Sequence, residues 1–161
     1  MGNLQLTPDD VCRLQAIAVK DIWAEAGEFR KKPIDISNTP HQPPDWEEVE
    51  GLVAEMCDYA NSISSDGIAA SAYLMWRLNW IHPYPDGNGR TSRAISYLAL
   101  CCGLGLELPG TLTVPDLIVR NREPYYHALD AADAAWKLKK VDTSQMEGLI
   151  RDLLTEQLST M

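Results

Sequence analysis

The centre of the chain is the run Ile81-His82-Pro83-Tyr84-Pro85-Asp86-Gly87-Asn88-Gly89-Arg90-Thr91-Ser92-Arg93. Apolar segments flank it at residues 69–80 and 94–102, and both read as buried helices. Pro83 and Pro85 exclude a continuous helix through the run, because proline lacks an amide hydrogen and restricts the residue before it. The run is therefore predicted to be a loop that ends one helix and begins the next.

The glycines and arginines of this loop predict an anion-binding site. Gly87 and Gly89 flank Asn88, and glycine lets a backbone approach a ligand closely. The free amide groups of the first helical turn, together with the helix dipole, favour negative charge there. Arg90 and Arg93 lie near one face of that helix because they are three positions apart. Their guanidinium groups suit a polyphosphate.

Two more side chains of the loop point to catalysis. Asp86 offers an oxygen ligand of the kind that holds Mg²⁺ together with substrate phosphates. His82 is the side chain here whose ordinary pKa suits a general base near neutral pH. A tight turn followed by a solvated helix face would explain these parts singly, but not their combination. The parts together predict transfer chemistry on a metal-bound nucleotide, with His82 activating the acceptor.

Residues 82–93 resemble the signature loop of Fic domains, His-Pro-Phe-x-Asp/Glu-Gly-Asn-Gly-Arg-x-x-Arg. Every polar position matches, and Tyr84 stands where the family usually has phenylalanine. The resemblance implies protein AMPylation, in which AMP moves from ATP to a Ser, Thr or Tyr hydroxyl of a target protein and pyrophosphate leaves. Other members of the family transfer phosphate or use another nucleotide. Gly89-Arg90 favours AMP transfer, because the phosphate-transferring branch has Lys in the corresponding ending.

The resemblance also implies a role for each position of the loop. His82 would deprotonate the acceptor hydroxyl, Asp86 would hold Mg²⁺ against the phosphates, and Tyr84 would anchor the loop in the core. The anion hole and the arginines that bind the outer phosphates would be Gly87, Asn88, Gly89, Arg90 and Arg93. A non-catalytic nucleotide-binding regulatory module remains an alternative, although a binder has no need of the base His82.

Length and composition predict one globular domain over residues 1–161, with 45% hydrophobic residues. The net charge of −9 argues against general nucleic-acid binding, which needs a basic face. Cysteine usage without Cys-x-x-Cys spacing predicts reduced thiols. Asp9 and Asp10 near the start, and the lack of a long apolar run, predict a cytoplasmic protein with no signal peptide and no membrane partner.

Before the loop, the pattern predicts an N-terminal helix over residues 7–26, with a capping box at Thr7 and Asp10. Residues 27–44 contain four prolines and a short alternation, which predicts a β-hairpin, with a connecting loop as the alternative. Fic domains carry a hairpin flap here, after a Gly-x-Phe/Tyr-Arg run that residues 27–30 resemble. The flap would clamp the target segment by adding a strand. The candidate target contacts are Lys32, Pro33, Ile34, Asp35 and Ile36, and His41 is predicted to lie on a solvated loop.

After the loop, the resemblance implies an adenine pocket near Tyr125 and Tyr126, with aromatic core packing as the alternative. A C-terminal helix is predicted over residues 142–161. Residues 143–148 match Ser/Thr-x-x-x-Glu-Gly/Asn, the inhibitory motif of many Fic proteins, in which Thr143 and Glu147 would belong to a segment that blocks the second arginine. The same residues also fit an ordinary helix start. Without such inhibition, restraint would come from a separate antitoxin-like partner or be absent.

Taken together, the sequence predicts an all-α, Fic-type helical bundle with a short β-hairpin flap. Residues 66–102 would form the signature loop with its flanking helices. ATP would be the substrate, Mg²⁺ the cofactor, and a target protein the partner that accepts AMP.

Overall fold

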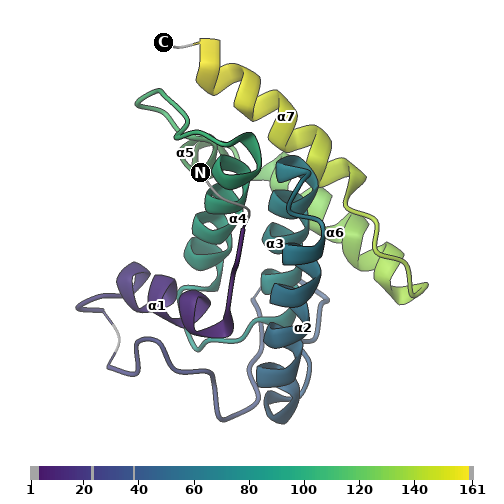
Figure 1. Ribbon diagram of the computed structural model, residues 1–161. Coiled ribbons are helices and arrows are strands. Elements are labelled where there is room, and N and C mark those ends of the chain that lie inside the picture. The colour runs from purple at the N-terminus through teal and green to yellow at the C-terminus, as the bar shows by residue number, and fades with distance from the viewer. Residues whose placement is uncertain (1–3, 23, 38, 160–161) are drawn as a thin grey trace.

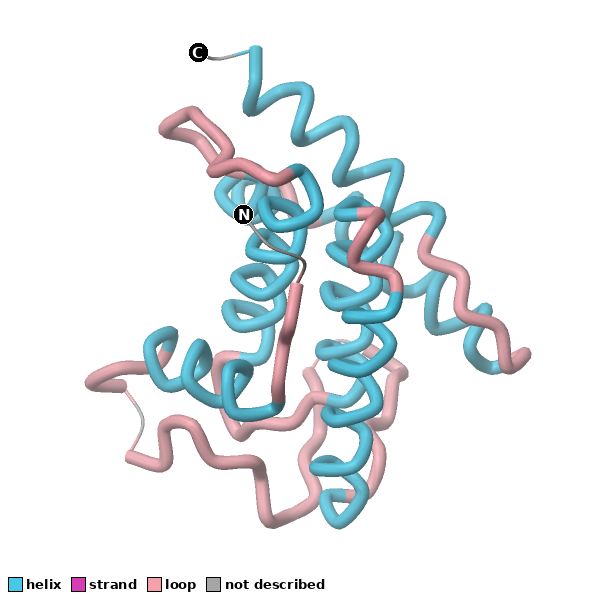
Figure 2. Tube along the Cα trace, viewed as in Figure 1, coloured by secondary structure: helices cyan, strands magenta, loops and turns pink. Residues whose placement is uncertain are grey.

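The computed structural model describes residues 4–22, 24–37 and 39–159, and this part of the chain is helical. Figure 2 shows helices and loops, with no strand over the described residues. The all-α prediction is confirmed. In chain order the elements are α1 (Pro8–Ala18), the 3₁₀ turn η1 (Trp46–Glu48), α2 (Val49–Ser62), α3 (Gly67–Ile81), α4 (Asn88–Leu104), α5 (Val114–Arg120), α6 (Glu123–Lys137) and α7 (Ser144–Ser159).

Helix α3 forms the centre of the fold, with α4 beside it and α7 crossing both at one end (Figure 1). Side chains such as Leu74 and Leu78 are fully buried, because α3 is apolar on almost every face. One apolar cluster lies mainly between α3 and helices α1, α2 and α4, and a second lies between α3 and helices α4 to α7. Packing on two sides fixes the C-terminal end of α3, where the run 81–93 begins.

Helices α3 and α4 run antiparallel and approach each other closely through glycine. A Cβ atom on Gly103 would lie 2.2 Å from the Cα of Gly67, so neither position has room for a side chain. Further along, the hydroxyl groups of Ser71 and Ser96 lie 2.7 Å apart across the same interface. The two helices that flank the signature loop are thereby held as one unit.

The N-terminal helix is shorter than the predicted range 7–26. Its predicted capping box is confirmed, since Thr7 and Asp10 bond each other's main-chain amides. Helix α1 then ends at Ala18 and gives way to turns, in which Asp21 has a φ of 63°. A left-handed residue cannot continue an α-helix, which accounts for the early end. The C-terminal helix, predicted over 142–161, is α7, and residues 160–161 lie outside the described chain.

The β-hairpin predicted for residues 27–44 is wrong for the described part of that segment, 27–37 and 39–44, which forms an irregular loop. Proline removes the amide donors that a two-stranded ladder needs, and this segment contains Pro33, Pro40, Pro43 and Pro44. The loop is instead attached by hydrogen bonds to the end of α3, as described below.

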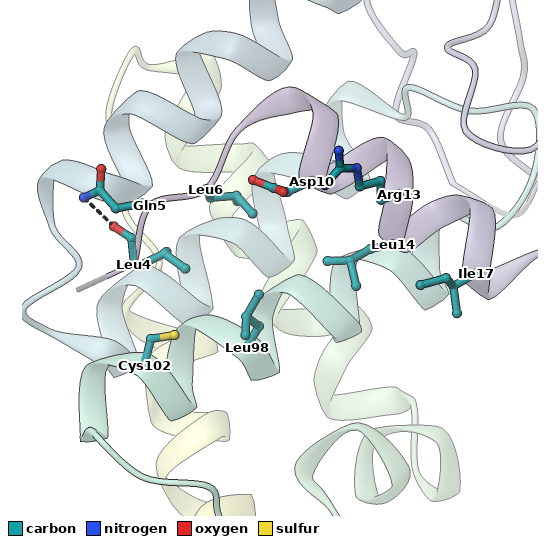
Figure 3. Close-up of a pocket in the computed structure, with 9 residues that line it drawn as sticks. All are labelled: Leu4, Gln5, Leu6, Asp10, Arg13, Leu14, Ile17, Leu98 and Cys102. Carbon is teal, nitrogen blue, oxygen red and sulfur yellow. Dashed lines mark hydrogen bonds between the residues drawn. The ribbon is translucent and has the colours of Figure 1, made fainter. Parts of the chain in front are cut away.

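One surface groove lies away from the central loop. An apolar groove lies between the N-terminal segment, α1 and α4, and Figure 3 shows the side chains that line it. Its lining residues are Leu4, Gln5, Leu6, Asp10, Arg13, Leu14, Ile17, Leu98 and Cys102, and none belongs to the run 81–93. Among the described residues, no helix combines the length and the apolar character that crossing a membrane would require.

Candidate active site

His82 lies at the C-terminal end of α3, where the chain leaves the helix. Its backbone is left-handed, with φ 50° and ψ 58°, and its amide donates to the Leu78 carbonyl oxygen at 2.9 Å. The ring is largely buried, and Nδ1 is enclosed with no hydrogen-bond partner among the described residues. Burial lowers the pKa of His82 to about 4, and nearby Arg30 and His41 act in the same direction, while the Asn79 carbonyl opposes them. The imidazole is therefore neutral at pH 7 and able to accept a proton.

Helix α4 begins directly after the loop, at Asn88, with an open N-terminus. Gly87 precedes it in a left-handed conformation with φ 82°, and no side chain of the described chain caps the helix. The amide of Thr91 donates to the Gly87 carbonyl oxygen at 2.9 Å, and this is the first bond of the helix. The amides of Asn88, Gly89 and Arg90 precede that bond, and such groups have no intrahelical acceptor. These free amides are the groups that the sequence predicts to bind an anion.

The Asn88 side chain serves the loop and not a ligand. It is buried, its Oδ1 accepts from the Tyr84 amide at 2.9 Å, and its Nδ2 donates to the Tyr84 carbonyl oxygen at 2.7 Å. The Tyr84 ring is fully buried with its centroid 5.5 Å from that of Phe29. Its hydroxyl donates to the Cys12 sulfur at 3.5 Å, which gives the extra oxygen of tyrosine a partner. Asn88 therefore offers an anion its backbone amide only.

Arg90 is tied to the loop and to α1. Its guanidinium donates to Asp86 Oδ2 at 2.8 Å and to the Ala18 carbonyl oxygen at 2.8 Å. Both members of the Asp86–Arg90 pair remain partly exposed, at 44% and 39% of their side chains. The pair thus combines the predicted metal ligand with the first of the two predicted phosphate-binding arginines.

Arg93 is the half-buried member of the two arginines, one turn further along α4. A Cβ atom on Gly89 would lie 3.3 Å from its Nη1, so the guanidinium stays beside the helix N-terminus. Burial lowers the pKa of Arg93, the proximity of Tyr125 raises it, and Arg122 lowers it again. No carboxylate of the described chain forms an ion pair with it. An unpaired, partly desolvated cation beside free amides favours an anionic ligand.

The two tyrosines predicted for an adenine pocket have different surroundings. Tyr125 is buried, and its hydroxyl accepts from Asn79 Nδ2 at 2.8 Å. The same nitrogen donates to the Ser92 hydroxyl at 2.9 Å, and Ser92 donates to the Gly89 carbonyl oxygen at 3.0 Å. Tyr126 is half exposed. Tyr125 therefore belongs to a polar network that supports the start of α4, and Tyr126 is the one of the two with surface to offer a ligand.

Two supporting residues were absent from the predicted site. Gln15 of α1 is completely buried, donates to the Asp86 carbonyl oxygen at 3.1 Å, and accepts from the Gly27 amide. Arg30 is also buried, and its Nε donates to the His82 carbonyl oxygen at 2.8 Å. Gln15 gave no signal, because a polar residue in an amphipathic helix reads as solvent-facing. Arg30 belongs to the Gly-x-Phe/Tyr-Arg resemblance, which could have drawn attention to it.

The predicted target-contact residues lie together on the loop after Arg30. Lys32, Pro33 and Asp35 are exposed, while Ile34 and Ile36 are partly buried. The segment therefore presents side chains to solvent near the loop 82–87, to which Arg30 connects it.

Glu147 lies at a distance from the signature loop, in the first turn of α7. Its carboxylate accepts from the Thr143 hydroxyl at 3.3 Å and lies 3.5 Å from an Arg151 nitrogen. Glu147 also lines a surface pocket with Asp66 and Ala69, at the start of α3, whereas His82 lies at the end of that helix. The structure does not bring Glu147 to Arg93, and the motif residues act here as a helix start.

The all-helical fold, the predicted base His82 at the end of α3 and the open N-terminus of α4 are the features of a Fic-type domain. The sequence profile of the Fic/DOC family matches residues 5–100, more than half of the chain, and the chain belongs to this family. Among curated relatives, the chain is 29% identical to a protein adenylyltransferase Fic of Drosophila willistoni over 138 residues. It is 31% identical to one of Nematostella vectensis over 114 residues. These alignments cover 81% and 68% of this chain, but only 25% and 24% of the relatives.

Solved structures agree on the fold. A Fic family protein of Desulfovibrio desulfuricans G20 matches with a TM-score of 0.74 and 26% identity, over 96% of this chain and 47% of that one. Fic-1 of C. elegans, residues 134–508, matches with a TM-score of 0.75 and 21% identity, over 96% of this chain and 42% of that one. The chain thus spans about a quarter of its curated relatives and less than half of these structures.

Proposed function

We propose that this chain is a protein adenylyltransferase, which transfers AMP from ATP to a Ser, Thr or Tyr hydroxyl of a target protein and releases pyrophosphate. The observation that carries the proposal is geometric: His82, with its Nδ1 enclosed at the end of α3, lies one loop away from the uncapped N-terminus of α4, beside which Arg93 has no ion-pair partner among the described residues. The first supplies a proton acceptor, and the second supplies a place for phosphates. Relatives named protein adenylyltransferase support the same reaction class.

In the proposed reaction, some residues of the loop would bind the phosphates and His82 would accept the proton. The amides of Asn88, Gly89 and Arg90 would bind the phosphates, and Arg93 would neutralise the outer charge. His82 would take the proton of the attacking hydroxyl as the bond to the α-phosphorus forms and the bond to the pyrophosphate oxygen breaks. Binding both reactants at one end of α3 and α4 also supplies the proximity that this reaction needs.

Mg²⁺ fits the site through Asp86. One carboxylate with ATP phosphates and water is an ordinary ligand set for Mg²⁺, which seldom uses an all-protein cage. The described residues contain no group of three acidic, histidine or cysteine side chains that would form such a cage. When bound, the ion would neutralise charge on the phosphates. Arg90, which holds Asp86 Oδ2 at 2.8 Å, would keep the carboxylate at the mouth of the site.

The exposed part of the loop 31–37 would dock the target protein next to His82. Backbone groups on an irregular, exposed segment are able to pair with an extended peptide. The described loop has no strand of its own, so the loop would become a strand when it pairs with the target segment.

The test is incubation of the purified chain with ATP labelled at the α-phosphate, Mg²⁺ and a cell lysate. We expect label on a protein with the unmodified chain and none with His82→Ala. Label from ATP marked at the γ-phosphate, with none from the α-phosphate, would instead show phosphate transfer. Nucleotide binding without transfer of either label would contradict the proposal and support a regulatory binding module.

A further inference from the structure

The segment between α1 and η1 is attached to the end of α3 through two residues, Arg30 and His41. Arg30 is the first of them: its main-chain amide donates to the Pro83 carbonyl oxygen at 2.8 Å, and its Nε to the His82 carbonyl oxygen at 2.8 Å. Its remaining nitrogens reach the carbonyl oxygens of Lys32 and Pro44. Arg30 thus joins Lys32 and Pro44, near the two ends of this segment, and attaches both to the end of α3.

His41 is the second attachment, near the far end of the loop. Its Nε2 lies 2.8 Å from the Trp80 carbonyl oxygen, and its ring centroid lies 5.6 Å from that of the Trp80 side chain. Because a carbonyl oxygen only accepts, His41 Nε2 carries the hydrogen and donates it. The expectation of a solvated histidine is wrong, since only 13% of this side chain is exposed.

The other ring nitrogen of His41 faces α6. Nδ1 lies 3.9 Å from Asp133 Oδ2, and Asp133 Oδ1 accepts from the Trp76 ring nitrogen at 2.8 Å. The Asp133 carboxylate is thus oriented by the Trp76 indole and faces the His41 ring at a distance longer than a hydrogen bond, so the printed hydrogen bond of the ring is the one to Trp80. The loop, α3 and α6 therefore meet at His41. His82, which follows the last residue of α3, lies two positions after Trp80.

These contacts form a continuous set. Four successive carbonyl oxygens at the end of α3 accept hydrogen bonds from the loop: those of Trp80, Ile81, His82 and Pro83. The last carbonyls of a helix have no intrahelical donors, so outside donors fix where the helix ends and how the next residue is oriented. Here that next residue is the predicted base, in a left-handed conformation.

We propose that His41 is a positioning residue for AMP transfer: together with Arg30 it holds the described loop residues 31–37 and 39–40 at a fixed place beside His82, so that a docked target hydroxyl meets the predicted base. The inference rests on the proposed function for its catalytic consequence. The attachment itself is a property of the free chain. His41 takes no part in the chemistry and acts through the loop and the end of α3.

The contribution of the hydrogen bond is separable from that of ring packing by two substitutions. His41→Phe keeps an aromatic ring against Trp80 and loses the donor to its carbonyl oxygen. His41→Gln loses the ring and keeps an amide nitrogen that donates. His127→Phe makes the same chemical change at an exposed histidine of α6 and serves as the matched control.

The experiment follows amide hydrogen exchange of the full chain by mass spectrometry. In His41→Phe we expect the hydrogen-bonded amides at positions 30 and 41, which donate to the Pro83 carbonyl oxygen and the Thr39 hydroxyl, to exchange about tenfold faster, the size expected for one lost hydrogen bond, with α2 and α7 unchanged. His41→Gln should exchange as the unmodified chain does, and so should His127→Phe. Equal exchange in His41→Phe and the unmodified chain, or equal acceleration in both His41 variants, would overturn the attachment.

A second arm measures label transfer from α-labelled ATP to lysate proteins beside the binding of Mg²⁺–ATP. We expect His41→Phe to reduce transfer several-fold, about as much as one hydrogen bond allows, with unchanged affinity for Mg²⁺–ATP and with recovery in His41→Gln. Unchanged transfer in His41→Phe would overturn the catalytic part. If the unmodified chain transfers no label, the proposed function fails, while the exchange arm still decides the attachment.

Discussion

The side-chain amide of Gln15 donates to the main-chain carbonyl oxygen of Asp86 at 3.1 Å, across 71 positions of sequence. The other end of the same amide accepts from the Gly27 amide, where the loop that leads to Arg30 begins. One buried side chain therefore joins α1, the residue predicted to hold Mg²⁺ and the start of the loop predicted to dock the target. This geometry makes Gln15 a support for both halves of the site.

Gln15→Leu should destabilise the fold and weaken nucleotide binding together. The change leaves the partly buried Gly27 amide and Asp86 carbonyl oxygen without this partner, at a cost of about 1 kcal/mol for each group. Asp86 would then lose its fixed orientation, and Mg²⁺–ATP affinity measured by calorimetry should fall. The matched control is Gln157→Leu, which removes an equally buried amide that bonds Val114, Tyr97 and Pro109 far from the loop. Equal affinities of the two variants would contradict a supporting role for Gln15.

The buried imidazole of His82 should make stability depend on pH between about 4 and 6.5. Its pKa in the folded chain is about 4, below the ordinary value, so the unfolded chain binds a proton that the folded chain does not. Stability should therefore fall as pH drops from 6.5 to 4, by at most about 3 kcal/mol from this group. Urea unfolding of the unmodified chain and of His82→Asn, a residue that tolerates the left-handed backbone, measures the difference. Identical pH dependence of the two proteins would refute the shift.

The same shift predicts the acid limb of catalysis. In the free protein His82 loses its basic form only near pH 4, so kcat/KM should stay level down to that region. Phosphates beside the ring favour the imidazolium form, which raises the pKa in the complex. The acid limb of kcat should consequently lie at higher pH than that of kcat/KM. An acid limb of kcat/KM near 6.5 would show that the ring is solvated in the free protein.

Gly87→Ala should damage the loop by a clash more than by backbone strain. The added Cβ atom would lie 2.5 Å from Val19 Cγ1, and φ is +82°. Gly105→Ala provides the control, since φ there is +71° and nothing lies within 4 Å of the added atom. Thermal unfolding should show a loss of roughly 1 kcal/mol for Gly105→Ala, from strain alone, and a clearly larger loss for Gly87→Ala. Val19→Ala in the same chain should restore part of that difference, and no recovery would mean that the clash is not its cause.

Tyr125→Phe should reduce activity through the polar network beneath α4. The change removes the acceptor of the Asn79 amide and the oxygen near Arg93, which costs about 1 kcal/mol in stability. We expect a several-fold lower affinity for Mg²⁺–ATP, because Arg93 loses a neighbour that orients it. Tyr126→Phe changes a half-exposed ring beside it and should leave the unfolding temperature in place. If Tyr125→Phe binds Mg²⁺–ATP as tightly as the unmodified chain, the polar network does not contribute to nucleotide binding.

Glu147→Gly should leave the transfer rate unchanged. The Glu147 carboxylate contacts Thr143, just before α7, and Arg151 on α7, and the variant loses these bonds and about 1 kcal/mol of helix stability. A sharp increase in label transfer would instead show that Glu147 reaches the second arginine in another conformation. The rate must be compared at a temperature well below the unfolding of both proteins.

The sequence was most informative where local chemistry decides structure. Proline placement and the glycine pair predicted a loop between two helices, and the structure has it between Ile81 and Asn88. What the sequence could not show depends on contacts between distant segments. Gln15 gave no sign of being buried, and His41 read as solvated, because their partners lie 71 and 39 positions away. The hairpin prediction failed for the same reason: bonds to the end of α3 took the place of a ladder.

The hydrogen bond from Gln15 of α1 to the Asp86 carbonyl oxygen also affects when the site forms during synthesis of the chain. A ribosome releases Gln15 long before Asp86, and at about 5–20 residues per second the intervening 71 residues take roughly 4–14 s. During that time α1 has neither the loop nor α4 to pack against. The predicted nucleotide site of the nascent chain therefore forms late, after both helices of the central pair have emerged. Synthesis order alone would thus delay the proposed transfer until the signature loop and both of its flanking helices have been made.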